Sequence, residues 1–324
     1  MKALFNKSPF FIFGSGFLFS ISLWNAGLNF HKTHNSIGAV FSQSIIDIKT
    51  KAIEPIKTSQ KVIVVGGSNT AYGVDSIQIE NSLGIKAINY GCMVGLGPEI
   101  ILESLKPNLI SGDILIMCWE YETYLFDRRN QNLNYLGMIS GPQTKVYEEF
   151  PFSDRIMLNL SFPAHLIRRS IFHAYNPWYD LSIYECGWDF DSSGNVRSNK
   201  IAKIEEDELV RSPLKPLLNK IDISQDLHVI FSNFMAFSGK QTIKVFATWP
   251  NTFANPSYVN NRTYLENIKR ISNFWSKLNV PILGKPEGAM FPAKYFHDSV
   301  YHLNSEGTKL RTDNLIEELN QWVP

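Results

Sequence analysis

Ser68 follows a β-branched run and two glycines, a place where a serine can act as a nucleophile. The stretch from Lys61 to Ser76 reads KVIVVGGSNTAYGVDS. A phosphate-binding loop needs G-x-x-x-x-G-K-[ST], with its lysine on the phosphates, and this turn has no lysine in place. The dinucleotide fingerprint G-x-G-x-x-G and the lipase elbow G-x-S-x-G are absent too. Two interpretations remain: Ser68 is a nucleophile at the carboxyl end of a strand, or Ser68 or Asn69 merely caps the next helix.

Asp298 and His302 supply the groups that a serine nucleophile needs. They lie in FHDSVYHLNSEGTKLRT, between the last apolar run and the last helical segment. A serine hydroxyl becomes a good nucleophile when a histidine takes its proton and a carboxylate orients that histidine. In the competing interpretation, His302 is a structural histidine and Asp298 pairs with an arginine or lysine elsewhere. The combination with Ser68 favours catalysis.

The elements that must position these residues alternate between short apolar runs and helical segments. The apolar runs are KVIVV, KAINY, DILIMCW, TIKVFATW and VPILG, and the last helical segment is SEGTKLRTDNLIEELNQW. Short apolar runs without polar alternation are typical of strands buried on both faces. The sequence therefore predicts an α/β domain with a parallel sheet covered by helices.

An irregular, aromatic-rich block interrupts this alternation at about residues 127–226. Within it, PFSDRIMLNLSFPAHLIRRSIFHAY favours a helix and GWDFDSSGNVRS a hairpin or loop. A block of this length inside an α/β domain is usually an insertion that covers or shapes a site. Its aromatic residues are candidates for stacking on sugar rings or for filling the insertion's own core; they are Trp178, Tyr179, Tyr184 and Trp188.

Three blocks of the sequence resemble the SGNH/GDSL hydrolase superfamily. VVGGSNTAYGVD resembles the first block, with Ser68 in the nucleophile position and Gly67 where the commoner G-D-S-L form has aspartate. INYGCMVG resembles the second block, whose glycine, here Gly91, donates a backbone N–H to the oxyanion. DSVYHLNSEG resembles the last block, which carries Asp298 and His302. The resemblance implies a three-layer α/β/α flavodoxin-like fold, and an oxyanion bound by the N–H groups of Ser68 and Gly91.

The sequence departs from the family pattern in two places. The usual last block is D-x-x-H, whereas three residues separate Asp298 from His302 here, and the neighbouring His297 is a possible competitor. The third block normally supplies an asparagine to the oxyanion, but this chain has CWEYET, with Glu120, Tyr121 and Glu122 as possible site-lining residues. An ionised carboxylate cannot donate a hydrogen bond. The third donor is therefore Tyr121, a protonated glutamate or Asn69, or it is missing.

The N-terminus predicts a membrane anchor. No Asp, Glu, Lys or Arg occurs from Ser8 to Phe30, and a helix needs roughly 20 apolar residues to cross a bilayer. Lys2 and Lys7 precede the run, which favours a cytoplasmic N-terminus. A cleaved signal peptide is the alternative, but no clean A-x-A site follows. The expected organisation is an anchor at 1–30, an amphipathic juxtamembrane helix and linker at 31–60, and the SGNH-like domain at 61–324.

Composition excludes several other classes of protein. Lys and Arg total 31 against 30 Asp and Glu, a net charge of +1 without the basic face of a nucleic-acid-binding protein. The three cysteines form no C-x-x-C pair and match no metal spacing. We therefore expect no metal, no organic cofactor and no nucleic acid.

With the anchor, the chain resembles membrane-tethered SGNH-like proteins that act on cell-envelope polysaccharides. The resemblance implies a serine-dependent ester hydrolase or O-acyltransferase, in the cytoplasmic (inner) membrane with its C-terminal domain outside the cytoplasm. Its partners would be an acylated glycan or acyl donor, the bilayer through residues 8–30, and an optional membrane acyltransferase. The alternative is a catalytically degenerate SGNH-like domain that binds glycan or such an acyltransferase.

Overall fold

The computed structural model describes residues 9–129, 132–176, 188–201 and 203–322, with side chains from residue 14 onward. Its centre is a five-stranded sheet in the order β2-β1-β3-β4-β6. All neighbouring strands run parallel, and Val62 of β1 lies opposite Ala87 on one side and Ile114 on the other. The strands are β1 (Lys61–Gly66), β2 (Lys86–Gly91), β3 (Ile114–Cys118), β4 (Lys244–Thr248) and β6 (Ile282–Leu283). The predicted parallel α/β sheet is confirmed. Because β5 belongs to a separate two-stranded sheet, the strands of this sheet, counted along the chain, have the order 2-1-3-4-5.

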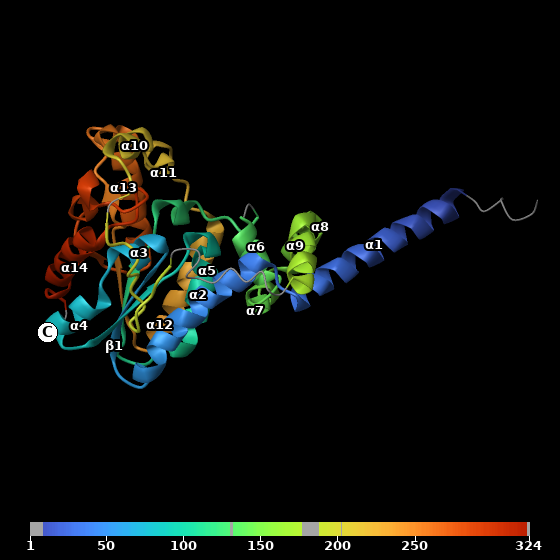
Figure 1. Ribbon diagram of the computed structural model, residues 1–324, viewed down its shortest axis with the longest axis horizontal. Helices are drawn as coiled ribbons and strands as arrows, with labels where there is room; N and C mark the ends of the chain where they lie inside the picture. The colour runs from blue at the N-terminus through green and yellow to red at the C-terminus, as the bar shows by residue number, and fades with distance from the viewer. Residues whose placement is uncertain (1–8, 130–131, 177–187, 202, 323–324) are drawn as a thin grey trace, which may run out of the picture. The chain divides into compact units, whose positions relative to one another are not determined.

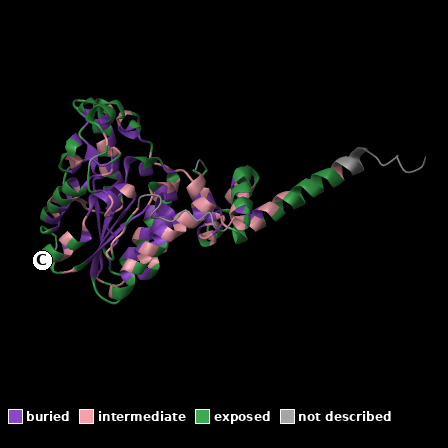
Figure 2. Cartoon of the chain, in the orientation of Figure 1, coloured by how far each residue is buried: buried purple, intermediate pink, exposed green. Residues whose placement is uncertain are grey.

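Helices flank the sheet because both of its faces are apolar. Val62 and Val64 pack in one cluster with Ile79 of α4 (Ser76–Leu83) and Leu315 of α14 (Ser305–Leu319). The alternate residues of β1 point to the other face and are equally buried. Figure 1 shows α5 (Gly97–Leu105) and α12 (Gln225–Lys240) on that opposite side. The interior of the sheet therefore has almost no exposed surface (Figure 2).

The chain divides into two compact units. One contains residues 42–135 and 182–324, with the sheet; the other contains residues 1–41 and 136–181. The N-terminal helix α1 (Pro9–Thr33) thus groups with part of the predicted insertion, while α2 (Ile37–Ile53) crosses the division in sequence. The predicted boundaries at residues 30 and 60 stay a prediction.

The part of the insertion that groups with α1 is helical. It contains α7 (Thr144–Glu148), α8 (Phe152–Ser161) and α9 (Ala164–Tyr175), while α6 (Leu133–Ile139) begins just before it. The helical structure expected from Pro151 to Tyr175 is confirmed and consists of two helices. Pro163 explains the break, because proline has no N–H to donate and clashes with the preceding turn.

Among the helices of the residues described above, none is both long enough and apolar enough to cross a membrane. The expected transmembrane anchor begins at Ser8, before the first described side chain, and its described part does not support a span.

The remaining elements connect the sheet to the site. They are the helices α3 (Ser68–Gly73), α10 (Glu206–Arg211), α11 (Lys215–Leu218) and α13 (Arg262–Lys277), and the short parallel pair β5 (Thr252–Phe253) and β7 (Met290–Phe291). Single 3-10 turns follow β2 at Val94–Leu96 and β3 at Tyr121–Leu125.

Candidate active site

Ser68 lies at the carboxyl end of the sheet, where its strand order reverses. β1 ends at Gly66, opposite Cys118 at the end of β3, and Ser68 is the first residue of α3. β1 pairs with β2 on one side and with β3 on the other, so the strand order reverses at β1. Ligands of open α/β sheets bind at such a reversal point. The half-buried Ser68 is therefore in a position suited to a nucleophile.

The carboxylate of Glu120 contacts Ser68 directly. Glu120 Oε1 accepts a hydrogen bond from Ser68 Oγ at 3.3 Å and one from the Asn69 N–H at 2.9 Å. Its Oε2 is buried and has no hydrogen-bond partner among the described residues. Burial raises the pKa of Glu120 above its usual range, against the lowering effect of the hydrogen bond from Asn69. The sequence placed Glu120 at the site edge but gave no sign that it would bind the serine.

The same carboxylate explains why residue 67 is a glycine. A Cβ at Gly67 would lie 2.2 Å from Glu120 Oε2 and 2.3 Å from Oε1, so only glycine leaves room for it. The carboxylate at this strand-end turn is therefore brought from the residue that follows β3 by two positions.

Two of the groups expected to bind an oxyanion, Asn69 and Gly91, are engaged elsewhere. The Asn69 amide donates to the Cys118 carbonyl at 3.1 Å, and its oxygen accepts from the Cys118 thiol. The Gly91 N–H donates to Asn89 Oδ1 at 2.9 Å, and a Cβ at Gly91 would lie 2.1 Å from the backbone nitrogen of Ala71. Tyr121 is buried. The N–H of Ser68, at the first position of α3, has no acceptor within its helix.

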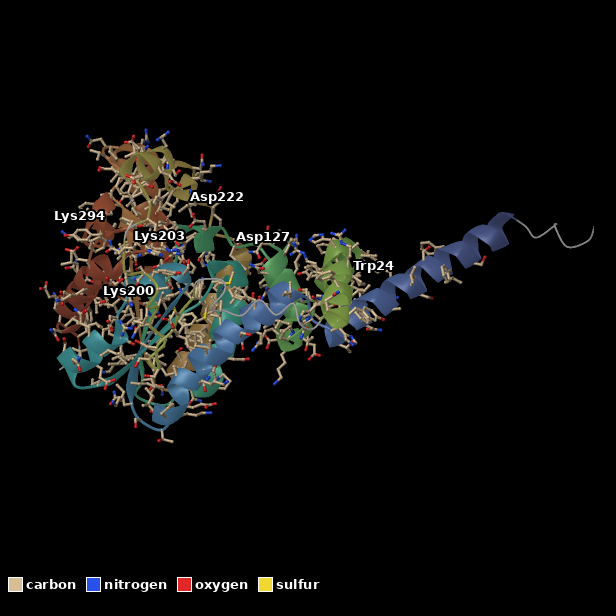
Figure 3. All side chains as sticks on the ribbon, viewed as in Figure 1. Trp24, Asp127, Lys200, Lys203, Asp222 and Lys294 are labelled. Carbon is tan, nitrogen blue, oxygen red and sulfur yellow. The ribbon has the colours of Figure 1, made fainter. Side chains whose placement is uncertain are left out.

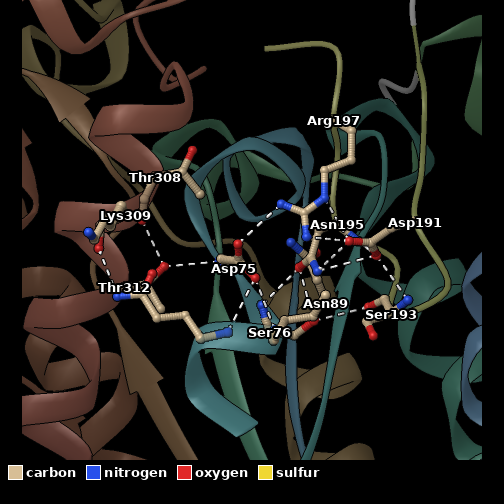
Figure 4. Close-up of polar contacts among 12 residues, drawn as sticks. Asp75, Ser76, Asn89, Asp191, Ser193, Asn195, Arg197, Thr308, Lys309 and Thr312 are labelled. Atoms are coloured by element: carbon tan, nitrogen blue, oxygen red, sulfur yellow. Dashed lines mark hydrogen bonds and ion pairs between the residues drawn. The ribbon is translucent and has the colours of Figure 1, made fainter. Parts of the chain in front are cut away.

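Polar contacts beneath α3 fix its position on the sheet (Figure 4). Asn89 Nδ2 donates to the Thr70 carbonyl at 3.0 Å and to the Val74 carbonyl at 2.8 Å, which holds the end of the helix. Asn195 Oδ1 accepts from the Ser76 N–H at 2.8 Å, and Arg197 pairs with Asp75 at 3.2 Å. Residues 188–198, which carry the bridge Phe190↔Val196, thus hold the start of α4, and Val196 packs against Ala71 and Tyr72 of α3.

Asp298 and His302 are hydrogen bonded despite their unusual spacing. His302 Nδ1 and Asp298 Oδ1 are 2.7 Å apart. A bridge between Phe296 and Leu303 closes the loop, and Ser299 Oγ accepts from the backbone N–H groups of Tyr301 and His302. The loop therefore forms a capped turn, in which an i, i+4 spacing places the two side chains together.

His297 does not take this place. Its Nδ1 lies 2.6 Å from the Ile201 carbonyl oxygen, and its Nε2 is 3.9 Å from Asp298 Oδ2. Burial acts to raise the pKa of Asp298, but the hydrogen bond and charge of His302, with lesser contributions from His297 and Lys203, hold it below its usual range. Lys203, labelled in Figure 3, is tied to this loop by its own N–H, which donates to the His297 carbonyl at 2.5 Å.

Tyr72 brings the two halves of the site together. Its ring stacks on His302 at a centroid distance of 4.1 Å and an interplanar angle of 8°. Tyr72 is four residues after Ser68 on α3, and side chains at this spacing share a helix face. His302 therefore lies over the face of α3 that carries Ser68, although the hydroxyl of Ser68 donates to Glu120 and not to His302. Burial and the nearby Asp298 charge raise the pKa of Tyr72 to about 12.

Trp188 extends this aromatic surface. It meets Tyr72 edge to face at 5.7 Å and is half-buried. Among the insertion's candidate aromatics, this residue alone lies in the described part of the chain, since Trp178, Tyr179 and Tyr184 fall outside it.

Tyr301 is a site residue that the sequence reasoning missed. Its hydroxyl donates to Glu122 Oε2 at 2.6 Å and accepts from the Tyr121 N–H at 3.1 Å. Burial raises the pKa of Glu122, against the lowering effect of this hydrogen bond. The residue that widens D-x-x-H to D-x-x-x-H belongs to the turn that carries Tyr301, so the unusual spacing was the available signal. Glu122 also lines an open pocket with Leu125, Leu214 and Lys215.

The described residues contain no group of three or more His, Cys, Asp or Glu side chains that could hold a metal ion. No protein-family model matches this sequence, and a search of curated proteins found no significant match.

Proposed function

We propose that the protein is a serine-dependent ester hydrolase or O-acyltransferase of the three-layer SGNH type, acting on a cell-envelope or exported polysaccharide. The observation that carries the proposal is the stacking of His302, held by Asp298, on Tyr72, which is four residues after Ser68 on α3. The family resemblance supports the glycan substrate, and the position of the site at the sheet's reversal point supports a ligand there.

In this mechanism Ser68 Oγ attacks an acyl carbonyl, and His302 accepts the hydroxyl proton and returns it to the leaving group. Asp298 keeps His302 in the tautomer with a proton on Nδ1, which leaves Nε2 as the base. The N–H of Ser68 is an oxyanion donor, and a protonated Glu120 is a second one through Oε2. Ser68 must first exchange its hydrogen bond with Glu120 for one with His302.

A specific observation favours the second candidate, a degenerate domain that binds glycan or a membrane acyltransferase. The Ser68 hydroxyl donates to Glu120, and the Gly91 N–H is occupied by Asn89. Losing one oxyanion donor typically costs about 10²–10³ in rate, so a site with fewer donors has less catalytic power.

Labelling with a fluorophosphonate and turnover of p-nitrophenyl acetate separate the two candidates. Ser68→Ala should abolish both signals with the fold intact, and His302→Ala should cost about as much. The double variant should lose little more, because triad members act as a unit. Asp298→Asn should cost on the order of 10⁴ through the wrong histidine tautomer. Unchanged turnover in Ser68→Ala would exclude the enzyme proposal, and a folded protein without either signal would favour the binding domain.

The proposal includes a single-pass location in the cytoplasmic membrane, with the sheet-containing unit outside the cytoplasm. The uncharged run from Ser8 to Phe30 and the lysines before it support this orientation. A C-terminal alkaline phosphatase fusion should be active in cells. An inactive fusion, together with an active cytoplasmic reporter at the same position, would reverse the orientation.

A further inference from the structure

In the unit formed by residues 1–41 and 136–181, helix α8 presents an apolar face to solvent. Phe152 is 71% exposed, Met157 63% and Leu160 72%, with Ile156 between them on the same face. Residues at spacings of three and four share a helix face, so these side chains form one continuous strip. An amphipathic helix of a globular domain buries such a strip. Here the strip faces outward, and Figure 2 shows it in the exposed class.

Contacts with α1 hold α8 and α9 in this arrangement. Trp24, labelled in Figure 3, donates its indole N–H to the Asn159 carbonyl at 2.9 Å. The buried His31 binds Ser170 of α9 at 2.5 Å through Nδ1 and Ser140 at 2.9 Å through Nε2. The apolar strip of α8 is therefore a fixed feature of this unit.

The exposed strip does not stand alone. The part of α1 that precedes Trp24 is also exposed and apolar, including Phe17, Leu18, Phe19 and Leu23. Ile171 and Tyr175 of α9 add exposed apolar surface, with Tyr175 at 74%. Large exposed apolar side chains on α1, α8 and α9, helices of the same unit, indicate an interaction site.

The charges around the strip identify the partner's chemistry. Between Phe152 and Tyr175 the sequence has three arginines, Arg155, Arg168 and Arg169, and one acidic residue, Asp154. Arg168 and Arg169 are exposed on α9, and Arg155 lies over the Phe152 ring at 5.9 Å. Arginines beside exposed aromatic and aliphatic side chains suit an anionic phospholipid surface, because the apolar parts enter the acyl boundary while the guanidinium groups reach the phosphates.

We propose that the outward face of α8, with Arg168, Arg169, Ile171 and Tyr175 of α9, lies in the interfacial layer of a bilayer that contains anionic phospholipid. This surface lies in the membrane plane beside α1 and is distinct from any span by α1 itself. It is independent of the proposed catalytic function. Interfacial helices enter about 5–10 Å into the headgroup and acyl boundary.

The experiment uses the full chain, reconstituted into vesicles of equal parts phosphatidylcholine and phosphatidylglycerol. Cys92 and Cys118 are buried and unreactive, and Cys186→Ser removes the third thiol. Met157→Cys then carries a nitrobenzoxadiazole label, and Leu160→Cys is a second labelling site. The matched control is Val259→Cys, which is equally exposed, at 71%, but lies in the sheet-containing unit.

Vesicles should shift the emission at 157 and 160 to the blue, and spin-labelled lipids should quench it, while the label at 259 should not respond. In the labelled Met157→Cys protein, Arg168→Gln and Arg169→Gln should each lower the affinity for lipid about fivefold and thereby weaken the quenching. This loss should occur only with the anionic vesicles. Equal responses at 157 and 259 would overturn the proposal. A blue shift at 157 without lipid would do so too, because it would assign the face to a second copy of the chain.

Discussion

Replacing Glu120 with glutamine tests the contact that most distinguishes this site. Glu120→Gln keeps an oxygen to accept from Ser68 and Asn69, and replaces the unpartnered Oε2 by an amide that donates. The volume is unchanged, which matters because Gly67 leaves no additional room. The substitution therefore removes one ionisable proton and alters little else.

The size of the effect follows from the charge. Ser68 Oγ is 3.3 Å from Glu120 Oε1, so an oxyanion on the attacked carbonyl would form two bonds further away. Two negative charges about 5 Å apart repel by about 3 kcal/mol at an effective dielectric constant of 20, or roughly 10²-fold in rate. Wild-type protein with an ionised Glu120 should turn over substrate more slowly than Glu120→Gln by this factor. With a protonated Glu120 the two rates should be equal.

The pH dependence separates these two states. Because burial raises the pKa of Glu120, the turnover rate of the wild type should equal that of Glu120→Gln at acidic pH. It should become lower than that of Glu120→Gln as pH rises through that pKa. The free energy of unfolding of the wild type should also decrease, relative to Glu120→Gln, as pH rises. A carboxyl group whose pKa is raised by folding stabilises the native state below the unfolded pKa of 4.5, and this contribution is lost as pH rises through the folded pKa. Above that point Glu120→Gln should therefore melt at a higher temperature than wild type.

The assay is p-nitrophenyl acetate turnover across pH, with melting curves in the same buffers. Glu122→Gln is the control, since the pKa of Glu122 is raised too but its carboxylate binds Tyr301 and not Ser68. A rate ratio that does not change with pH would refute the electrostatic reasoning. A well-folded Glu120→Gln without activity would refute it differently, by showing that the carboxyl group itself transfers a proton.

Two further predictions concern packing and pH. Gly67→Ala should lower the free energy of unfolding by about 1–3 kcal/mol, because its Cβ would overlap the Glu120 carboxylate, and Glu120→Ala in the same chain should restore most of the loss in urea melts. An equal loss in both backgrounds would mean that the strain lies elsewhere. The pKa of His31 is lowered because burial outweighs its hydrogen bonds to backbone. Its contribution to the free energy of unfolding is therefore present above its unfolded pKa of 6.5 and is lost as pH falls through the folded pKa. The protection factors of the α9 amides, which correct for the pH dependence of intrinsic exchange, should therefore fall below pH 6.5, and His31→Phe should remove that pH step; a step of unchanged size would assign it to another group.

Much of the sheet was determined by the sequence alone. Each apolar run became a parallel strand, because strands buried on both faces need continuous apolar residues and are distinguishable by that pattern. The position of Ser68 after β1, and of Asp298 and His302 in the last loop, also follows from the order of elements along the chain. A local turn then explains why the spacing D-x-x-x-H still gives a hydrogen-bonded pair.

Only the tertiary structure decided which groups meet at the site. Glu120 binds Ser68 because the ends of the neighbouring strands β1 and β3 come together across a long sequence separation. Packing also groups residues 136–181, which lie within the predicted insertion at about 127–226, with α1. Patterns along a chain record burial and periodicity, but hydrogen-bond partners depend on distances that exist only after the chain has folded.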